Sequence, residues 1–270
     1  MRKPLYPERP VVSAVEPSRR AKPKAAFFDF TDCEGCQLQF ANMGATLLAL
    51  TELVDIVNFR EIMSEQGEDY DVAFIEGSIT TDTDVKRIKR IREKAKVIIA
   101  LGSCATIAGV NGIKNRTSLD VAKQRVYGDK ADTVNTIKAM PVHEVVKVDY
   151  FINGCPVYIP EVISVIKCVL MGKPYPVPNY PVCVECKMNE NVCRYEKDQE
   201  CLGPVTRAGC NSWCINYGNK CYGCRGLVDN PAVHGQKDIL LKYGLKTEDI
   251  LNNFTLYNDS MGEKYDPEFK

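Results

Sequence analysis

Short apolar runs alternate along the chain with longer segments whose apolar residues recur at helical spacing. The runs predict five strands, at residues 25–30, 54–59, 72–75, 97–101 and 147–152. The helical spacing predicts helices at residues 37–53, 85–95 and 159–171, with a cap for the second within residues 81–84. Strands that alternate with helices favour a mostly parallel sheet with helices on both faces, so the expected fold class is α/β.

A proline-rich connector divides the chain near residue 178. Before it we expect an N-terminal extension, residues 1–24, and the α/β domain, residues 25–178. After it we expect a small irregular domain, residues 179–270, with one amphipathic helix at 238–245 and then a charged tail. Residues 179–228 contain few apolar runs and cannot make much hydrophobic core, so we expect bound metal to hold them together.

Four of the thirteen cysteines follow predicted strands. Cys33 and Cys36 come after the first strand, Cys104 lies in a tight glycine turn after the fourth, and Cys155 follows the fifth. In open parallel sheets, ligands bind beyond the carboxyl ends of the strands, so we expect these four thiols to meet. A Cys-x-x-Cys pair also suits a redox-active dithiol, but such a site needs no further thiols.

Eight more cysteines crowd into the C-terminal part of the chain as two runs of four. The runs are Cys183, Cys186, Cys193 and Cys201, and then Cys210, Cys214, Cys221 and Cys224. Four thiolates hold one [4Fe–4S] cluster, so twelve cysteines suit three clusters and a path for single electrons. Structural zinc is the alternative, because Cys₄ zinc sites also use paired cysteines. The partition of the eight between two sites stays open, since a run can lend one ligand to a neighbouring cluster.

Composition and charge narrow the class of protein. Apolar residues make up 45% and charged residues 26%, as in soluble globular proteins. The formal net charge is +0, which creates no field toward nucleic acid or an anionic membrane. No apolar run is long enough to span a bilayer, and no signal-peptide core is evident, so we expect a cytoplasmic protein without structural disulfides. Glycine motifs for a dinucleotide or a phosphate are missing, which argues against a nicotinamide or flavin site in this chain.

Six short strings carry a resemblance to a known family. They are CEGCQLQF at 33–40, IEGSI at 75–79, GSCA at 102–105, GCP at 154–156, GPVTRAGC at 203–210 and CYGCRG at 221–226. With them the chain resembles the small subunit of [NiFe] hydrogenases, and within that family the small (delta) subunit of the cytoplasmic sulfhydrogenase or NAD(P)-linked branch. The resemblance covers roughly residues 25–230. It implies a flavodoxin-like N-terminal domain followed by a C-terminal cluster domain.

The resemblance also implies which cysteines hold which cluster. The proximal cluster would be held by Cys33, Cys36, Cys104 and Cys155, the medial cluster by Cys210, Cys214, Cys221 and Cys224, and the distal cluster by Cys183, Cys186, Cys193 and Cys201. Cys183 stands where periplasmic relatives commonly have a histidine, and Cys214 where they often have a proline. Ligation by thiolate alone implies three [4Fe–4S] clusters of low potential.

The function implied by the resemblance is that of an electron-transfer small subunit of a soluble [NiFe] hydrogenase. As part of that enzyme it would serve H2 oxidation or evolution, but it would hold no catalytic residue, because hydrogen is cleaved at the nickel–iron centre of a partner large subunit. Further expected partners are a diaphorase with FAD and NAD(P) and ferredoxin-like iron–sulfur subunits, or a sulfur-reducing module.

Two other electron-transfer circuits stay open. In one, the hydrogenase feeds a heterodisulfide reductase or a deazaflavin module. In the other, the chain is the quinone-facing subunit of a complex-I-like machine, although that subunit usually has adjacent cysteines in its first motif and a single cluster.

A few residues outside the ligand sets keep open roles. Glu34 and Glu76 lie beside the expected proximal cluster, where either can assist a proton path or hold an interface. Trp213 can shield a cluster from water or simply pack. Cys168 lies among apolar residues and is expected to be a buried structural thiol.

Overall fold

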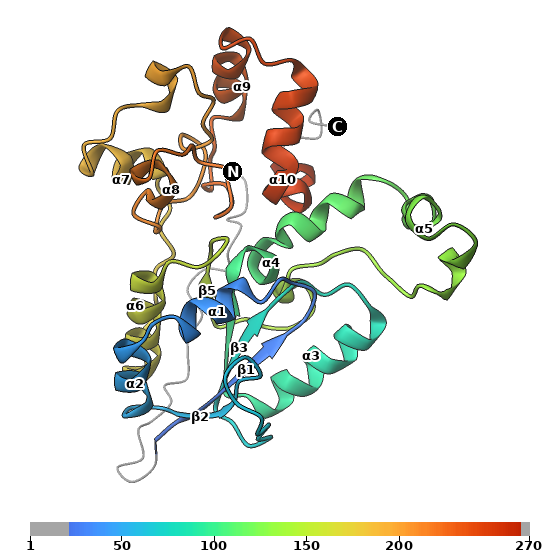
Figure 1. Cartoon of the computed structure of the whole chain (residues 1–270), viewed down its shortest axis with the longest axis vertical. Helices are drawn as coiled ribbons and strands as arrows, with labels where there is room; N and C mark the ends of the chain where they lie inside the picture. Colours follow the sequence, from blue (N-terminus) through green and yellow to red (C-terminus); the bar gives the residue numbers. More distant parts are fainter. Residues whose placement is uncertain (1–21, 266–270) are drawn as a thin grey trace.

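The computed structural model describes residues 22–265, with side chains as far as residue 260. Its centre is a five-stranded sheet in the order β2-β1-β3-β4-β5, in which every pair of neighbours is parallel (Figure 1). The strands are β1 (Lys24–Asp29), β2 (Asp55–Asn58), β3 (Val72–Glu76), β4 (Val97–Leu101) and β5 (Tyr150–Ile152). The α/β prediction is confirmed, and the strand order is that of flavodoxin-like doubly wound sheets. Of the predicted N-terminal extension, residues 1–21 lie outside the described residues.

The two faces of the sheet bury two separate hydrophobic cores. One core joins the side chains of Phe27 and Phe74 to α1 (Gly35–Ala41) and α6 (Ile159–Leu170). The other joins Ala26 and its neighbours on the opposite face to α3 (Asp82–Lys94). Figure 1 shows α6 on one side of the sheet and α3 on the other. Because successive side chains of a strand point to opposite faces, burial on both sides explains the continuous apolar runs in the sequence.

The predicted helix over residues 37–53 is wrong as one element, because the structure has two helices there. They are α1 and α2 (Ala45–Thr51), separated at Gly44, whose φ is 56° and ψ −126°. That backbone conformation favours glycine, so the chain turns there although the apolar spacing continues. The predicted cap of the helix that follows β3 is confirmed: Thr81 and Asp84 form a reciprocal capping box at the start of α3.

Between β4 and β5 the chain forms short helices that the apolar pattern did not predict. They are α4 (Gly102–Ile107), α5 (Leu119–Tyr127) and the 3-10 helices η1 (Gly109–Arg116), η2 (Gly128–Thr133) and η3 (Val142–Glu144). The tight turn expected at residues 102–104 is therefore wrong. Gly102 has a φ of 83°, and the chain continues directly from β4 into the first turn of α4, which carries Cys104.

The C-terminal part lies beyond the carboxyl ends of the strands (Figure 1). Its elements are α7 (Val182–Met188), η4 (Arg194–Lys197), α8 (Trp213–Asn216), α9 (Val233–Lys242) and α10 (Thr247–Tyr265). The helix expected at 238–245 corresponds to α9, which begins earlier. The expected charged tail is wrong within the described residues, because it forms α10.

The helix α10 returns to the sheet domain and helps to build a third hydrophobic core. Phe254 of α10 belongs to a buried cluster with Ile107 of α4 and with Leu202 and Val205, and Ser260 Oγ donates to the Ile107 carbonyl at 2.6 Å. The cysteine-rich segment thus has more apolar support than its own composition suggests. Nowhere between residues 22 and 265 is a helix both long and apolar enough to cross a bilayer.

Candidate functional site

The first four thiols gather where three strands of the sheet end. Cys33 and Cys36 flank the start of α1, Cys104 lies in α4 and Cys155 follows β5. Burial, together with negative charge on Cys155 and Cys33, raises the pKa of the Cys104 thiol to about 12. Burial also raises the pKa of Cys36, to which charge on Cys155 contributes. The structure therefore brings together the four residues that the strand ends predicted to meet.

Glu76 fixes the position of Cys36 from the neighbouring strand. Its carboxylate, 2% exposed at the end of β3, accepts the backbone N–H groups of Cys36 and Gln37, each at 2.9 Å. These are the free N–H groups at the start of α1, so Glu76 caps that helix from a position 40 residues away. Glu34, in contrast, is partly exposed and forms an ion pair with Arg60.

The turn after β3 is shaped by a glycine that no other residue can replace without strain. Gly77 has a φ of 94°, and a Cβ there would lie 2.8 Å from the Phe30 carbonyl carbon and 2.7 Å from Asp32 Oδ2. Asp32 in turn accepts the N–H of Glu34 at 3.2 Å, and burial raises its pKa to about 6. The loop that carries Cys33 therefore packs directly on the end of β3.

The second thiol group is formed by Cys183, Cys186, Cys193 and Cys201. Its first two members lie within α7, and the other two follow that helix. Burial, together with negative charge on the other three cysteines, raises the pKa of Cys183 to about 12. A Cβ on Gly203 would lie 3.3 Å from Cys183 Sγ and 3.4 Å from Cys201 Sγ, so this glycine gives the two sulfurs room.

The third group, formed by Cys210, Cys214, Cys221 and Cys224, lies around α8 and the loop that follows it. Burial raises the pKa of Cys224 to about 12, and charge on Cys210 contributes. Burial and charge on both Cys201 and Cys224 raise the pKa of Cys221. Cys214 is the exposed member of the group.

The third group lies between the other two. On one side Cys224 receives charge effects from Cys155, a member of the first group. On the other side the Cys221 backbone N–H donates to Cys201 Sγ at 3.3 Å. The spatial order of the groups is thus first, third, second, which differs from their order along the chain. Since Cys221 contacts a member of the second group, the partition of the eight C-terminal cysteines stays a prediction.

The donor chemistry of the three groups suits iron–sulfur clusters. All thirteen cysteines, each within the described part of the chain, are free thiols. A buried thiol with a raised pKa keeps its proton at neutral pH unless a bound cation replaces it, and metal ligation releases that proton. Within residues 22–265, no three His, Cys, Asp or Glu side chains are arranged as a single metal ion would require.

Several residues around the thiols were missed by reasoning from the sequence. Tyr257 of α10 donates a hydrogen bond to the Cys155 sulfur, but its segment had been expected to be a charged tail. Glu185 of α7 accepts the N–H groups of Gly209 at 2.7 Å and Ser212 at 3.1 Å, on either side of Cys210. The sequence does show a carboxylate directly before Cys186. Its role could not be predicted, because the backbone groups that it binds lie more than twenty residues further along the chain.

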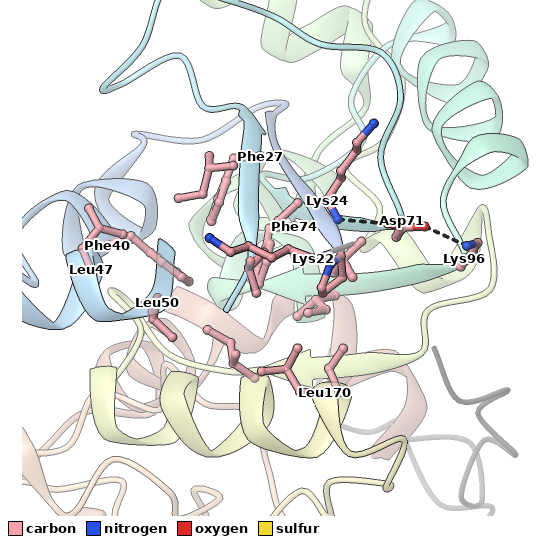
Figure 2. A pocket seen from close by; sticks show the side chains of 18 of the residues that line it. Lys22, Lys24, Phe27, Phe40, Leu47, Leu50, Asp71, Phe74, Lys96 and Leu170 are labelled. Carbon is pink, nitrogen blue, oxygen red and sulfur yellow. Dashed lines mark hydrogen bonds and ion pairs between the residues drawn. The ribbon is translucent and has the colours of Figure 1, made fainter. Parts of the chain in front are cut away.

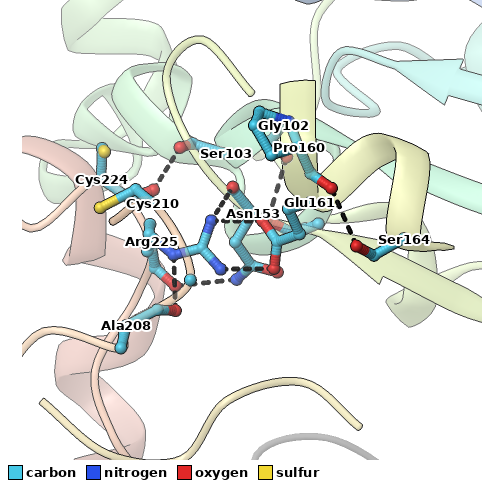
Figure 3. Close-up of polar contacts among 12 residues, drawn as sticks. Gly102, Ser103, Asn153, Pro160, Glu161, Ser164, Ala208, Cys210, Cys224 and Arg225 are labelled. Carbon is cyan, nitrogen blue, oxygen red and sulfur yellow. Dashed lines mark hydrogen bonds and ion pairs between the residues drawn. The ribbon is translucent and has the colours of Figure 1, made fainter. Parts of the chain in front are cut away.

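A buried ion pair joins the third group to the sheet domain. The guanidinium of Arg225 contacts the carboxylate of Glu161, on α6, through two hydrogen bonds of 2.7 Å each (Figure 3). Ser103 donates to the carbonyl of Cys224 in the same region. Trp213 packs against Tyr158, with ring centroids 5.8 Å apart, at the start of α6. Trp213 is half-buried, so packing accounts for at least part of its role.

Cys168 lies apart from the three groups. It packs against the core that α6 shares with the sheet, but it is only partly buried, whereas a buried thiol was expected. A cavity of about 370 Å³ adjoins this core at the amino ends of the strands, and Figure 2 shows Phe27, Phe40 and Phe74 on its walls. No cysteine is among the residues that line this cavity.

Comparison with known proteins shows the family to which this chain belongs. Residues 33–169 match the family described as NADH ubiquinone oxidoreductase, 20 Kd subunit. A chain of the NAD+-reducing [NiFe]-hydrogenase, in its H2-reduced state, has a similar fold: the TM-score is 0.52 at 24% identity, over 58% of this chain and 96% of that chain.

Two relatives narrow the class further. The delta subunit of sulfhydrogenase 2 from Pyrococcus furiosus is 37% identical over 219 residues, which cover 80% of this chain and 92% of the relative. A subunit of the vhu F420-non-reducing hydrogenase from Methanococcus voltae is 31% identical over 87% of this chain and 96% of the relative. The chain therefore belongs to the family of hydrogenase small subunits, in which the delta subunits fall.

Proposed function

We propose that this chain is the electron-transfer small subunit of a cytoplasmic [NiFe] hydrogenase. Electrons would pass between a nickel–iron large subunit and a reducing module through three [4Fe–4S] clusters, held by the three cysteine groups. The observation that carries the proposal is the spatial series of the groups, linked at Cys155–Cys224 and at Cys221–Cys201. A series of closely spaced redox centres is what single-electron transfer through an insulating protein requires.

The chain's own residues would orient the ligands and exclude water. A bound [4Fe–4S] cluster supplies one-electron chemistry at a potential set by its ligands, hydrogen bonds and exposure. Glu76 holds Cys36 through the start of α1, and Tyr257 donates to Cys155. Glu185 orders the backbone around Cys210. These bonds restrain the sulfur donors before metal arrives, which favours ligation at a defined geometry.

The partners at the two ends of this path belong to the proposal as well. Cys33 and Cys155 are exposed, so the first group faces the surface that a large subunit would cover. The solved relative is part of a NAD+-reducing enzyme, which supports a flavin and NAD(P) module as the other partner. The Pyrococcus relative is named a sulfhydrogenase, which supports a sulfur-reducing module instead.

A different electron acceptor is the second candidate. The Methanococcus relative is named for a hydrogenase that does not reduce F420. Because F420 is a deazaflavin, this name supports a heterodisulfide reductase rather than a deazaflavin module as the alternative circuit. Identifying the proteins that purify with this chain distinguishes the two.

Anaerobic purification of the native complex tests the proposal. We expect the chain to be brown, to hold about twelve iron atoms and as much sulfide, and to lose its broad absorption with dithionite. A nickel-containing large subunit should purify with it. A colourless chain that holds zinc, or a brown chain whose companions contain no nickel, would contradict the proposed function.

A further inference from the structure

The buried guanidinium of Arg225 lies between the chain segments that carry Cys210 and Cys224. Arg225 directly follows Cys224, and its Nε donates to the Ala208 carbonyl at 2.8 Å, two residues before Cys210. A Cβ on Gly209 would lie 2.9 Å from the guanidinium carbon, so the charge rests against the backbone beside Cys210. Figure 3 shows Arg225 beside Ala208, Cys210 and Cys224. The Arg225 side chain is 1% exposed.

The same side chain reaches the segment of Cys155. Its Nη1 donates to the carbonyl of Asn153, and Asn153 Nδ2 donates back to the Arg225 carbonyl at 2.8 Å. Glu161, two residues into α6, completes the contacts with its bidentate carboxylate. The hydrogen bonds of one guanidinium therefore link the three segments that carry Cys155, Cys210 and Cys224.

The position of this charge gives it an electrostatic effect as well as a structural one. The guanidinium lies against the backbone of Gly209, beside Cys210, and Arg225 itself follows Cys224 directly in the chain. An arginine keeps its charge in proteins, and both carboxylate oxygens of Glu161 accept hydrogen bonds from this guanidinium at 2.7 Å. Inside a protein the low dielectric strengthens such an effect, and a nearby cation stabilises whatever species carries more negative charge.

We propose that Arg225, held by Glu161, is a positioning residue that raises the reduction potential of the cluster bound by Cys210, Cys214, Cys221 and Cys224. Reduction adds one electron to that cluster, taken from the neighbouring centre or from a chemical reductant, and the added negative charge is stabilised by the guanidinium. Glu161 opposes part of this effect. The inference rests on the proposed function, since it requires a cluster at the third group.

Redox titration of the anaerobically purified full complex, followed by electron paramagnetic resonance, tests the inference. In Arg225→Gln one of the three cluster midpoint potentials should fall. We expect the ratio of oxidised to reduced cluster at a fixed potential to change at least tenfold, which is about 59 mV for a one-electron couple. In Glu161→Gln the same midpoint should rise, and in Arg225→Lys, which keeps the charge, it should change less than in Arg225→Gln.

Arg207→Gln is the matched control. Arg207 is also fully buried, and its guanidinium pairs with Asp229 and donates to the Pro178 carbonyl and to Asn179 Oδ1. We expect this variant to lower thermal stability and to leave the three midpoints in place. A shift of the same midpoint in Arg207→Gln as large as in Arg225→Gln would overturn the inference.

The double variant Glu161→Gln/Arg225→Gln covers the case in which a single variant fails to assemble, because it buries no unpaired charge. Retention of iron with a midpoint between those of the single variants supports the inference. Loss of the cluster in the double variant, or unchanged midpoints in variants that retain full iron content, would overturn it. Absence of iron from the unmodified complex would instead reject the proposed function itself.

Discussion

Single residues far apart in the sequence decide where the cysteines lie. Glu76 caps the helix that begins at Cys36, and Glu185 accepts the N–H groups around Cys210. Each is a carboxylate that satisfies backbone donors which a helix start or a tight loop leaves free. Such residues set the geometry of the ligands without being ligands.

Asp71 shows the same principle at the other end of the sheet. It directly precedes β3, accepts the Lys24 N–H at 2.9 Å and pairs with Lys96 at 2.8 Å (Figure 2). Burial raises the pKa of Asp71, but these two partners outweigh it and lower the pKa below the ordinary 3.8. The stability that Asp71 contributes is therefore present above pH 3.8 and is lost as the pH falls through its lowered pKa.

We predict that Asp71→Asn lowers the free energy of unfolding by about 1–2 kcal/mol at neutral pH. Urea denaturation of both proteins at several pH values measures this, and the difference should shrink below pH 3.8. Asp69→Asn is the control, since Asp69 is 88% exposed and should change stability little. An equal loss in both variants, or a difference that does not depend on pH, would contradict the prediction.

At the scale of elements, glycines mark where apolar spacing misleads. The spacing through residues 37–53 continues across Gly44, yet the backbone there turns with a φ of 56° and separates α1 from α2. A helix continues only while each residue adopts helical backbone angles. One residue with a positive φ therefore ends it, whatever the side-chain pattern.

Gly44→Ala should therefore destabilise the chain by about 1–2 kcal/mol. A Cβ at Gly44 would meet no atom within 4 Å, so any loss comes from the backbone and not from a clash. Gly235→Ala is the matched control: it also has open space, but it lies within α9 and should stabilise by up to about 1 kcal/mol. Thermal unfolding distinguishes the two, and a neutral Gly44→Ala would show that the turn carries no strain.

For the whole molecule, stability is unevenly distributed. The sheet has a hydrophobic core on each face, whereas the core around α7 consists of few residues besides cysteines. The helices α9 and α10 add a third core that reaches back to α4. With the proposed clusters bound, the cysteine-rich segment would therefore depend on metal for its stability more than the sheet does.

Removal of iron by a chelator under reducing conditions should destabilise the cysteine-rich segment, residues 179–228, more than the sheet domain. We expect amide hydrogen exchange in residues 179–228 to accelerate about tenfold or more, while β1, β3 and β4 stay protected. Exchange mapped by mass spectrometry measures this. Loss of protection in the central strands at the same rate would show that the two parts unfold as one unit.

Much of this arrangement could be predicted from the sequence, and the remainder has identifiable causes. The strands were predictable because burial on both faces produces runs such as residues 97–101. The first cysteine group was predictable because parallel strands end at one edge of the sheet. The helix α10 and the contact of Tyr257 with Cys155 were not, because the apolar residues of α10 are few and their partners lie in α4 and the cysteine-rich segment.

The sequence by itself determined the fold class, the thiol inventory and the family, because burial periodicity and ligand spacing are local properties of a chain. Only the tertiary structure decided which carboxylate caps which helix, that the third cysteine group lies between the other two, and that Arg225 joins the segments of three cysteines. These depend on contacts between segments many residues apart. No local pattern encodes them, because a side chain's partner is set by how whole elements pack.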